Sequence, residues 1–385
     1  MVKPVSASMY DVLIVGAGPA GSVLAYHLAK KGARILIIEK ARLPRPKPCG
    51  GGITWKTAQS LPYDISPVIE IAAEGGIVAY KGVPLLKTSV QQPFAWLIER
   101  ERFDTFLLEQ AVNAGAELHE DTSLVELRQE KDRVVVTTGK TVYSSRYVAG
   151  ADGVESLTAR LNGLLTNRRA GAALEAEVSV GETEKSLQGN YATFDFGAID
   201  HGYGWIFPKR DHLTIGVFHA TPATIDLKQA LNQFMRSQPV LKNCHLLNQR
   251  GQRIPLGGDR HPIQAGRVLL LGDAANLADA WLGEGLYGAI VSARIAAEEL
   301  SGCLNGYTKD LSQYQSRIDQ QIVNQLAAAR RFADWVYRFP HAGSKLIQRS
   351  QAMRNLVFGA IRGDLPYTSC AGEFLRCLPA ILLGR

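Results

Sequence analysis

The twelve residues Tyr10–Gly21, YDVLIVGAGPAG, decide the fold of this chain. An apolar run rich in β-branched residues ends at Gly16, and glycines then follow the G-x-G-x-x-G spacing. The first glycine permits a tight turn, the second lets the backbone approach a pyrophosphate, and the third lets a helix pack closely on the strand. We therefore expect a strand, a phosphate-binding turn and a helix whose free N–H groups face the phosphates.

The residues after this turn complete a strand–helix–strand unit. We expect a helix over Ala20–Lys31, stopped by Gly32, and a second apolar strand over Arg34–Glu39. Glu39 lies 18 residues beyond Gly21, where a carboxylate accepts from both ribose hydroxyls and repels a 2′-phosphate. These features predict a dinucleotide site formed by Gly16, Gly18, Pro19, Ala20, Gly21, Glu39 and Lys40.

Two later segments favour FAD over NAD as the dinucleotide. The sequence AGADG, 149–153, follows a strand, and RVLLLGDAA, 267–275, ends a second apolar strand. They resemble the "DG" and "GD" motifs of the large family of FAD enzymes typified by aromatic hydroxylases and geranylgeranyl reductases. The resemblance implies that Asp273, after Gly272, accepts a hydrogen bond from the ribityl chain of FAD. It also implies that Asp152 braces the fold near the pyrophosphate.

Three further contacts with the cofactor are expected. Gly283-Glu284-Gly285-Leu286 opens a helix whose N–H groups face the flavin pyrimidine ring. Such a helix N-terminus stabilises the negative charge of reduced flavin by about 1 kcal/mol. By the same resemblance, Arg100 in IERERFD, 98–104, approaches the flavin or the pyrophosphate, unless it is a surface arginine at a charged helix start. Leu124 matches a position whose backbone contacts adenine in relatives.

The loop KPCGGG, 47–52, follows the second strand. Its three glycines carry no side chains, so the backbone at Gly50 and beyond can approach a flat ring system. Cys49 beside them is a candidate to gate the site or to donate a proton. The alternative is a flexible loop with an incidental cysteine.

The segment YGWIFPK, 203–209, has the alternation of a strand. Side chains two apart point to one face, so Tyr203, Trp205 and Phe207 form one apolar wall. Such a wall suits an elongated hydrocarbon or an aromatic substrate, although plain sheet core would have the same pattern.

Together, the glycine loop and this aromatic segment resemble the geranylgeranyl reductase family over residues 9–305. The resemblance implies that reduced FAD saturates isoprenoid double bonds, with Cys49, Tyr203 and Trp205 at the catalytic centre. The sequence departs from the family pattern at Asp200, where a proline often precedes the tyrosine by three residues. Ala280-Trp281 stands where relatives commonly have a proline before G-E-G, and we expect this departure to alter the wall beside the flavin.

The order of these segments predicts an α/β protein: a Rossmann-like FAD-binding domain with an inserted antiparallel-sheet substrate domain and a helical C-terminal region. The FAD-binding domain is expected to comprise 9–60, 95–165 and 260–305, and the substrate domain 61–94 and 166–259. Residues 306–385 form the C-terminal region. Within the first domain, the alternation over Glu117–Asp152 predicts a small antiparallel layer.

Four functions fit this arrangement. Alkene reduction is favoured, with a monooxygenase, a flavin-dependent polyene cyclase or isomerase, and a non-enzymatic FAD-stabilised partner protein as alternatives. A W-x-W-x-I-P segment is absent, which disfavours a halogenase. A second G-x-G-x-x-G after a strand is also absent, so electrons are expected from transiently bound NAD(P)H or from a redox protein.

Charge is concentrated at the end of the chain. Residues 308–385 hold 11 Lys/Arg and 5 Asp/Glu, which is +6 of the total of +7. No nucleic-acid-binding motif accompanies this charge, so no nucleic-acid partner is expected. Aromatic and basic residues mixed in 311–385 suggest either a solvated helical face or contact with the inner face of a membrane; they are Arg330, Arg331, Trp335, Tyr337, Arg338, Phe339 and Lys345.

The remaining composition sets the expected compartment. The N-terminal apolar run, Val12–Val15, is too short for a signal peptide, and no apolar stretch approaches the roughly 18 residues of a membrane span. Five cysteines without metal-ligand spacing indicate reduced thiols and no metal site. We therefore expect a cytoplasmic protein.

Overall fold

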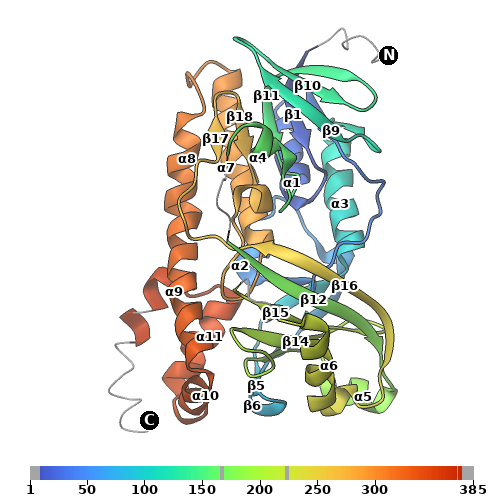
Figure 1. The fold of residues 1–385 in the computed structure, drawn as a ribbon, viewed down its shortest axis with the longest axis vertical. Coiled ribbons are helices and arrows are strands. Elements are labelled where there is room, and N and C mark those ends of the chain that lie inside the picture. Colours follow the sequence, from blue (N-terminus) through green and yellow to red (C-terminus); the bar gives the residue numbers. More distant parts are fainter. Residues whose placement is uncertain (1–8, 165–168, 222–224, 371, 375–385) are drawn as a thin grey trace.

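Two large sheets, one above the other, form the body of the molecule (Figure 1). The structure is a computed structural model and describes residues 9–164, 169–221, 225–370 and 372–374. The chain begins in the upper sheet, passes into the lower sheet and returns, and its C-terminal helices run along one side of both.

The upper sheet has eight strands, of which six follow the order β17-β18-β11-β1-β2-β8. Their bounds are β1 Tyr10–Val15, β2 Ile35–Ile38, β8 Glu117–His119, β11 Val142–Gly150, β17 Gln264–Ala265 and β18 Val268–Leu270. β1 pairs in parallel with β2 and β11, and its central residues are completely buried. A parallel strand covered on both faces reads as a continuous apolar run, which is why the first segment of the sequence predicts this strand so well.

Helices cover the faces of the upper sheet. α1 spans Pro19–Ala29, α3 spans Arg100–Asn113 and α7 spans Leu286–Leu304, and α1 packs against the other two. A short helix, α4, spans Leu157–Leu161, and a 3-10 turn, η3, spans Gly272–Ala275. The N-termini of α1 and α7 both point to the carboxyl ends of the parallel strands, where α/β sheets bind their ligands.

The predicted antiparallel layer over Glu117–Asp152 is partly wrong. β8 pairs in parallel with β2, and β11 in parallel with β1 and β18, so both belong to the main sheet. Only β9, Leu124–Gln129, and β10, Val134–Thr138, form an antiparallel hairpin, which β10 joins to β11. The alternation in the sequence corresponds to β10, whose residues are alternately buried and half-buried.

The lower sheet has seven strands in the order β16-β12-β15-β14-β13-β5-β6. Their bounds are β5 Gly75–Tyr80, β6 Val83–Ser89, β12 Ala170–Ser179, β13 Tyr191–Asp195, β14 Gly202–Pro208, β15 Leu213–His219 and β16 His245–Pro255. All neighbours are antiparallel except β13 and β5. One face packs on α6, Leu227–Ser237, through Ile206, Ile215 and Val217. Short helices α5, Glu182–Gln188, and η2, Pro239–Leu241, lie at one end.

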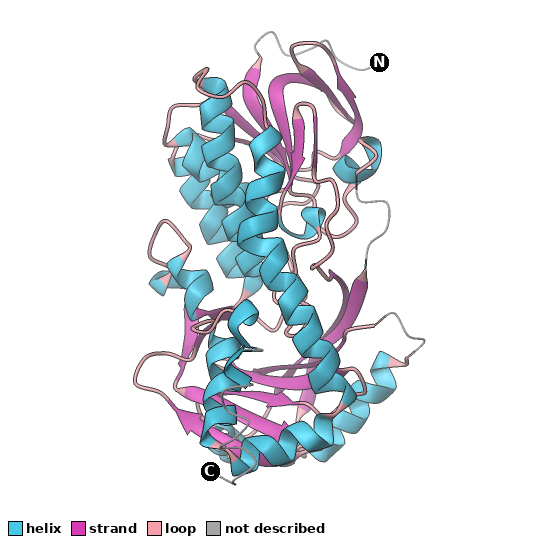
Figure 2. Ribbon diagram, turned by 90° about the vertical axis from the view of Figure 1, so that its left-hand side faces the viewer, coloured by secondary structure: helices cyan, strands magenta, loops and turns pink. Residues whose placement is uncertain are grey.

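Smaller elements join the two sheets. β3 Gly52–Thr54, β7 Ala95–Ile98 and β4 Ile69–Ala73 form a three-stranded sheet, accompanied by α2 Trp55–Gln59 and η1 Ser66–Val68. The C-terminal helices are α8 Ser312–Ile318, a π-helical turn Asp319–Val323, α9 Asn324–Arg338, α10 Pro340–Arg349 and α11 Gln351–Arg362. They descend from the upper sheet to the lower one, where α10 packs on β5 and β6 (Figure 2).

Candidate active site

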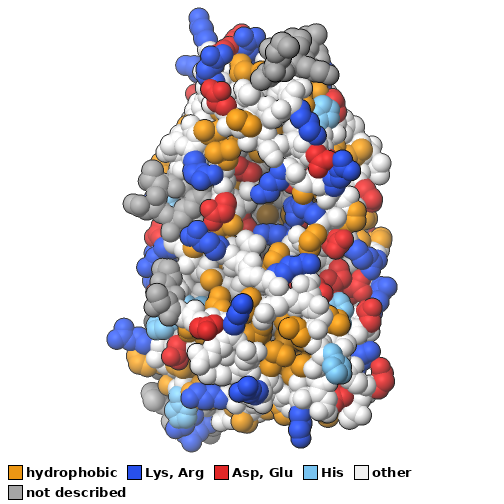
Figure 3. Space-filling model, turned by 45° about the vertical axis from the view of Figure 1, so that its right-hand side comes forward, with side chains coloured by type: hydrophobic (Ala, Val, Ile, Leu, Met, Phe, Trp, Pro, Cys, Tyr) orange, Lys and Arg blue, Asp and Glu red, His pale blue; other side chains and the backbone are white. Residues whose placement is uncertain are grey.

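One cavity of about 730 Å³ lies between the two sheets. It begins at the glycine turn after β1, passes the loop 45–52 and the start of α7, and ends against the aromatic residues of the lower sheet. Figure 3 shows a hollow in one face of the molecule with Lys and Arg side chains around it. All of the predicted cofactor-binding residues except Gly21 and Gly272 line this cavity.

Two positions of the turn require glycine, because a side chain there would clash with neighbouring backbone. Gly16 has φ +105°, and a Cβ there would lie 2.5 Å from the carbonyl oxygen of Ala151. A Cβ at Gly21 would lie 1.9 Å from the carbonyl oxygen of Gly16, so α1 can approach β1 only with glycine at this position. Gly18 and Pro19 line the cavity at the N-terminus of α1, where free N–H groups can bind phosphate.

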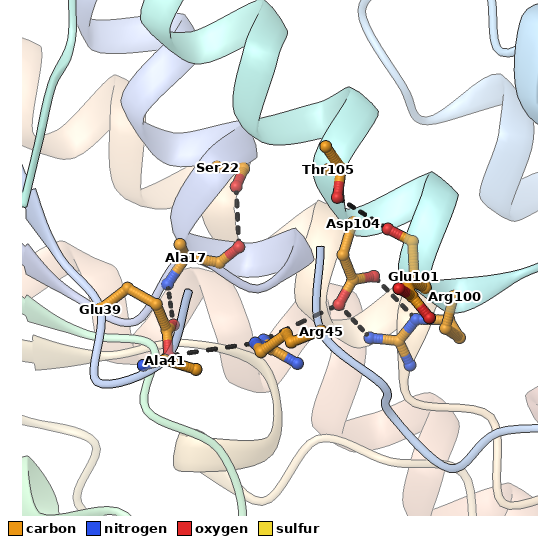
Figure 4. A network of polar contacts seen from close by, with 9 residues as sticks. All are labelled: Ala17, Ser22, Glu39, Ala41, Arg45, Arg100, Glu101, Asp104 and Thr105. Carbon is orange, nitrogen blue, oxygen red and sulfur yellow. Dashed lines mark hydrogen bonds and ion pairs between the residues drawn. The ribbon is translucent and has the colours of Figure 1, made fainter. Parts of the chain in front are cut away.

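Glu39 is fixed at the end of β2, in the position expected for the ribose contact (Figure 4). Its Oε2 accepts from the N–H of Ala17 at 2.8 Å, and its Oε1 accepts from the N–H of Ala41 at 3.0 Å. Nε of Arg45 lies 3.9 Å from the same Oε1, and Glu39, Lys40 and Arg45 all line the cavity. The two backbone bonds hold the carboxylate ready for a sugar hydroxyl.

Arg100 is the first residue of α3, and its side chain is only 10% exposed, so it is not a surface arginine. Its Nε and one terminal nitrogen donate to the two oxygens of Asp104 at 2.8 and 2.9 Å. Burial lowers the pKa of Arg100, but the charges of Asp104 and Cys49 and hydrogen bonds to both outweigh it and raise that pKa. Arg100 therefore stays a cation, held beside the Cys49 thiol.

Asp152 lines the cavity, and its carboxylate also braces the fold. Its Oδ1 accepts from the Ser156 hydroxyl at 2.6 Å, and its Oδ2 accepts from the N–H and the hydroxyl of Thr158 at 2.9 and 3.0 Å. These bonds fix the start of α4 beside the glycine turn. Leu124, the first residue of β9, lines the same end of the cavity.

Lys47 and Asp273 both line the cavity, and the charge of each acts on the other. Burial raises the pKa of Asp273, which the charges of Lys47 and Arg100 partly offset. Burial lowers the pKa of Lys47, and the charge of Asp273 opposes that change. Lys47 was not predicted as a site residue, although it opens the glycine loop and is the only cation within that motif.

The turn before α7 is anchored from several sides. The Tyr203 hydroxyl donates to the carbonyl oxygen of Leu282 at 2.6 Å, and Gly283 has φ +69°. Oε1 of Glu284 accepts from the hydroxyls of Thr57 at 2.5 Å and Thr54 at 3.2 Å. Gly285 lies beside Asp273, and Leu286 starts α7, so the N-terminus of this helix faces the cavity as predicted.

The glycine loop packs directly on the aromatic residues of β14. A Cβ at Gly50 would lie 2.8 Å from Nε1 of Trp205 and 3.0 Å from the ring of Phe207. Lys209 holds the loop from behind, because its buried ammonium donates to the carbonyl oxygens of Gly50 at 3.2 Å and Ile98 at 2.6 Å. The flat rings that approach the backbone of the glycine loop are therefore the side chains of Trp205 and Phe207. The loop forms one side of the cavity.

The aromatic wall is wider than the three predicted residues. Neighbouring strands add Phe194 from β13 and Phe218 from β15. The ring centroids of Phe194 and Phe207 are 5.4 Å apart, and those of Tyr203 and Phe218 are 5.6 Å apart. The signal for both was present in the sequence, since each lies in a segment with strand alternation.

Trp281 does not alter the wall beside the flavin, contrary to expectation. Its side chain is completely buried and packs against Phe196, Phe332 and Tyr367, with ring centroids 6.0, 4.8 and 6.1 Å away. It is not among the residues that line the main cavity, whereas the next residue, Leu282, is. Packing against the C-terminal helices turns the indole away from the site.

The aromatic residues proposed for a membrane surface are not all exposed. Tyr337 is buried and donates to the carbonyl oxygen of Trp281, so it cannot contact a membrane. Arg330 is paired with Asp259, and Trp335 packs against Phe374. Phe339 is 49% exposed. Over the described ranges, none of the helices combines the length and the apolar character that crossing a bilayer requires.

Comparison with known proteins agrees with this geometry. A family model described as "FAD binding domain" matches residues 9–188. Digeranylgeranylglycerophospholipid reductase 1 of Methanothermobacter thermautotrophicus is 30% identical over 312 residues, covering 76% of this chain and 78% of the relative.

Two solved structures share the fold. One, described as geranylgeranyl bacteriochlorophyll reductase-like, is from Thermoplasma acidophilum; it has a TM-score of 0.79 at 22% identity and covers 89% of this chain and 92% of its own. A flavin-dependent brominase has a TM-score of 0.75 at 19% identity and covers 96% of this chain and all of its own.

The residues present fit FAD along its whole length. The N-terminus of α1 at Gly18 suits the pyrophosphate and the fixed carboxylate of Glu39 suits the ribose. Asp273 and the N-terminus of α7 suit the ribityl chain and the flavin. The chain therefore belongs to the geranylgeranyl reductase family and is an FAD-dependent oxidoreductase.

Proposed function

We propose that this protein reduces carbon–carbon double bonds of an isoprenoid substrate of geranylgeranyl type. The observation that carries the proposal is the continuity of the cavity, which joins the FAD-binding turn to the aromatic wall without a break. A substrate lying on the wall formed by Tyr203, Trp205 and Phe207 would therefore contact a flavin bound against Asp273 and the start of α7.

The aromatic wall supports an apolar substrate in this proposal. Its five rings offer broad apolar surface, and the Tyr203 hydroxyl is already bonded to Leu282. Bound and reduced, FAD supplies a hydride to one alkene carbon. Transfer requires that carbon within about 3–3.5 Å of the donor, an arrangement that a tight apolar slot provides by orientation.

The other alkene carbon needs a proton from the protein. Cys49 is one candidate, because it lines the cavity at the glycine loop with its thiol beside Arg100. The electrons are proposed to come from NAD(P)H bound transiently or from a redox protein.

A monooxygenase is the second candidate, and the fold shared with a brominase favours it. Such an enzyme would use the same FAD site and the same apolar wall, but it would need oxygen. The two candidates thus differ in the mass they add to the substrate.

The test is anaerobic turnover of the FAD-loaded protein after reduction with dithionite. With geranylgeraniol or geranylgeranyl phosphate, we expect products heavier by two hydrogens per double bond reduced, measured by mass spectrometry. Turnover only in the presence of oxygen, with addition of an oxygen atom, would establish the monooxygenase instead. A control reaction without protein excludes direct reduction by dithionite.

A further inference from the structure

A buried carboxyl group lies in the wall of the cavity, on β12. Side chains alternate along this strand: Leu174 and Ala176 pack toward α6, whereas Ala173 and Glu175 line the cavity. Glu175 is 8% exposed, and its Oε2 is shielded from solvent without a hydrogen-bond partner among the described residues. An ionised carboxylate is costly in such a place, because burial without partners penalises the charged form.

The strand register brings Glu175 into line with Trp205. Glu175 pairs with Gly216 of β15, and Gly216 pairs with Trp205 of β14. A Cβ at Gly216 would lie 2.2 Å from Cζ2 and 2.3 Å from Cη2 of Trp205, so the indole extends over the glycine toward β12. The carboxyl group and the indole therefore lie in one row of the sheet, both facing the cavity.

The charges around Glu175 do not bring its pKa back to the ordinary value of a glutamate. Burial is the largest effect and raises the pKa of Glu175 to about 7; Glu177 and Glu99 act in the same direction. Lys209 and a hydrogen bond from the Cys49 backbone lower it. The Lys209 ammonium, however, is shared among two carbonyl oxygens and Glu99, whose Oε1 is 3.5 Å away.

Across the strand pair, the exposed Arg250 is the partner of Glu175 on β16 and lines the cavity as well. Burial affects the protonation of Glu175 more than any of these neighbouring groups does. Near neutral pH, Glu175 therefore holds its proton in a substantial fraction of molecules, which is the condition for a general acid.

We propose that Glu175 is the catalytic acid that protonates the second alkene carbon, an assignment that rests on the proposed function. The hydride forms a C–H bond at one carbon, and the π-electron pair forms a C–H bond at the other with the proton of the Glu175 carboxyl. The O–H bond breaks, a carboxylate remains, and it regains a proton from water. A two-electron donor, dithionite in the test below, restores the reduced flavin.

This assignment gives Cys49 a different task. Its sulfur accepts from the N–H of Gly51 at 3.4 Å, and its own backbone N–H contacts Glu175. Cys49 thus positions the glycine loop and the acid, and the proton comes from Glu175.

The first experiment observes the group without turnover. Infrared titration of the oxidised, FAD-loaded protein should show a protonated-carboxyl C=O band that disappears around pH 7. Glu175→Gln should lack this band, and Glu177→Gln should keep it. Glu177 is the matched control, because it lies two residues further along β12 but does not line the cavity. A wild-type protein without such a band above pH 6 would overturn the proposal.

The second experiment measures anaerobic oxidation of the reduced flavin by geranylgeraniol in a single turnover. The wild-type rate should fall about tenfold per pH unit above pH 7, because only the protonated acid is competent. Glu175→Gln should be slower by about 10²- to 10⁴-fold, with no fall at that pH. Cys49→Ala should retain the fall. Glu177→Gln should keep the wild-type rate at low pH and also the fall, which moves to lower pH because the charge of Glu177 raises the pKa of Glu175.

If Glu175→Gln matches the wild type in rate and pH profile, the proposal is wrong while the alkene reductase stands. If reduced wild-type protein is not oxidised by geranylgeraniol or geranylgeranyl phosphate, the proposed function fails, and the role of Glu175 with it. Should Glu175→Gln fail to retain FAD, Glu175→Asp replaces it. This variant keeps an acid and should retain a pH-dependent rate, and a flat profile would overturn the proposal.

Discussion

The hydroxyl of Tyr203 donates a hydrogen bond to the carbonyl oxygen of Leu282, and the two oxygens are 2.6 Å apart. This bond ties the aromatic wall of the lower sheet to the turn that precedes α7. Both partners line the cavity, so the bond fixes the distance between its aromatic wall and the N-terminus of α7.

Tyr203→Phe should weaken this connection. The Leu282 carbonyl would lose its donor in a buried place, which costs about 1–3 kcal/mol in the free energy of unfolding. Urea unfolding monitored by fluorescence measures this loss, and Tyr307→Phe is the control because Tyr307 is 85% exposed. Equal stability of the two variants would show that the Tyr203 bond contributes nothing.

Glu39→Ala and Asp273→Ala should each weaken FAD retention. Each removes a cavity-facing acceptor for a sugar hydroxyl, and a buried partner left unpaired costs about 1–3 kcal/mol. The ratio of flavin to protein absorbance after gel filtration measures retention. Asp211→Ala is the charge-matched control, since the Asp211 side chain is 91% exposed. Full retention by both site variants would count against the assignment of these carboxylates to FAD.

Gly50→Ala should destabilise the glycine loop. The added Cβ would lie 2.8 Å from Nε1 of Trp205, so the indole or the loop must shift, and overpacking of this kind costs about 1–3 kcal/mol. Gly139→Ala is the matched control, because a Cβ there meets nothing within 4 Å. Thermal unfolding of the two variants should therefore differ, with a lower Tm only for Gly50→Ala.

The buried Glu175 should make stability depend on pH. Its pKa is about 7 in the folded protein against an ordinary value of 4.5, so the folded state binds the proton more tightly. This contribution is complete below pH 4.5 and disappears as pH rises through 7, by at most about 3 kcal/mol. Urea unfolding of wild type and Glu175→Gln at pH 5 and pH 8 tests the sign. The wild type should lose stability relative to the variant at the higher pH.

We also predict peripheral membrane contact through the C-terminal helices, centred on Phe339 rather than Tyr337. Phe339 is 49% exposed and adjoins Arg338, so anionic vesicles should bind the protein and release it with salt. Phe339→Asp should reduce vesicle co-sedimentation, while Tyr307→Asp, at a more exposed aromatic elsewhere, should not. Equal binding to neutral and anionic vesicles would leave the basic residues as solubilising charge.

The strand–turn–helix at the start of the chain could be predicted because its signals are local. Gly16, Gly18 and Gly21 act on backbone within a few residues of themselves, and β1 has the predicted bounds. The place of Asp273 in the cavity wall was expected from the resemblance of RVLLLGDAA to the GD motif, and that of the turn at Gly283 from its position before a helix.

Glu175, Trp281 and Tyr337 were beyond local reasoning. A single glutamate in an alternating strand resembles a solvent-facing residue, and only the pairing of β12 with β15 and β16 buries it. Trp281 faces the core because Phe332 and Tyr367, far along the chain, pack around it. Tyr337 is buried in the same region, where its hydroxyl donates to the carbonyl oxygen of Trp281.

Two consecutive carbonyl groups of one turn accept hydrogen bonds from distant parts of the chain: Trp281 from Tyr337 of α9, and Leu282 from Tyr203 of β14. The C-terminal helices are therefore a structural support of the catalytic centre and not an appendage to it. A displacement of α9 would therefore reach the turn that precedes α7 through a single peptide unit.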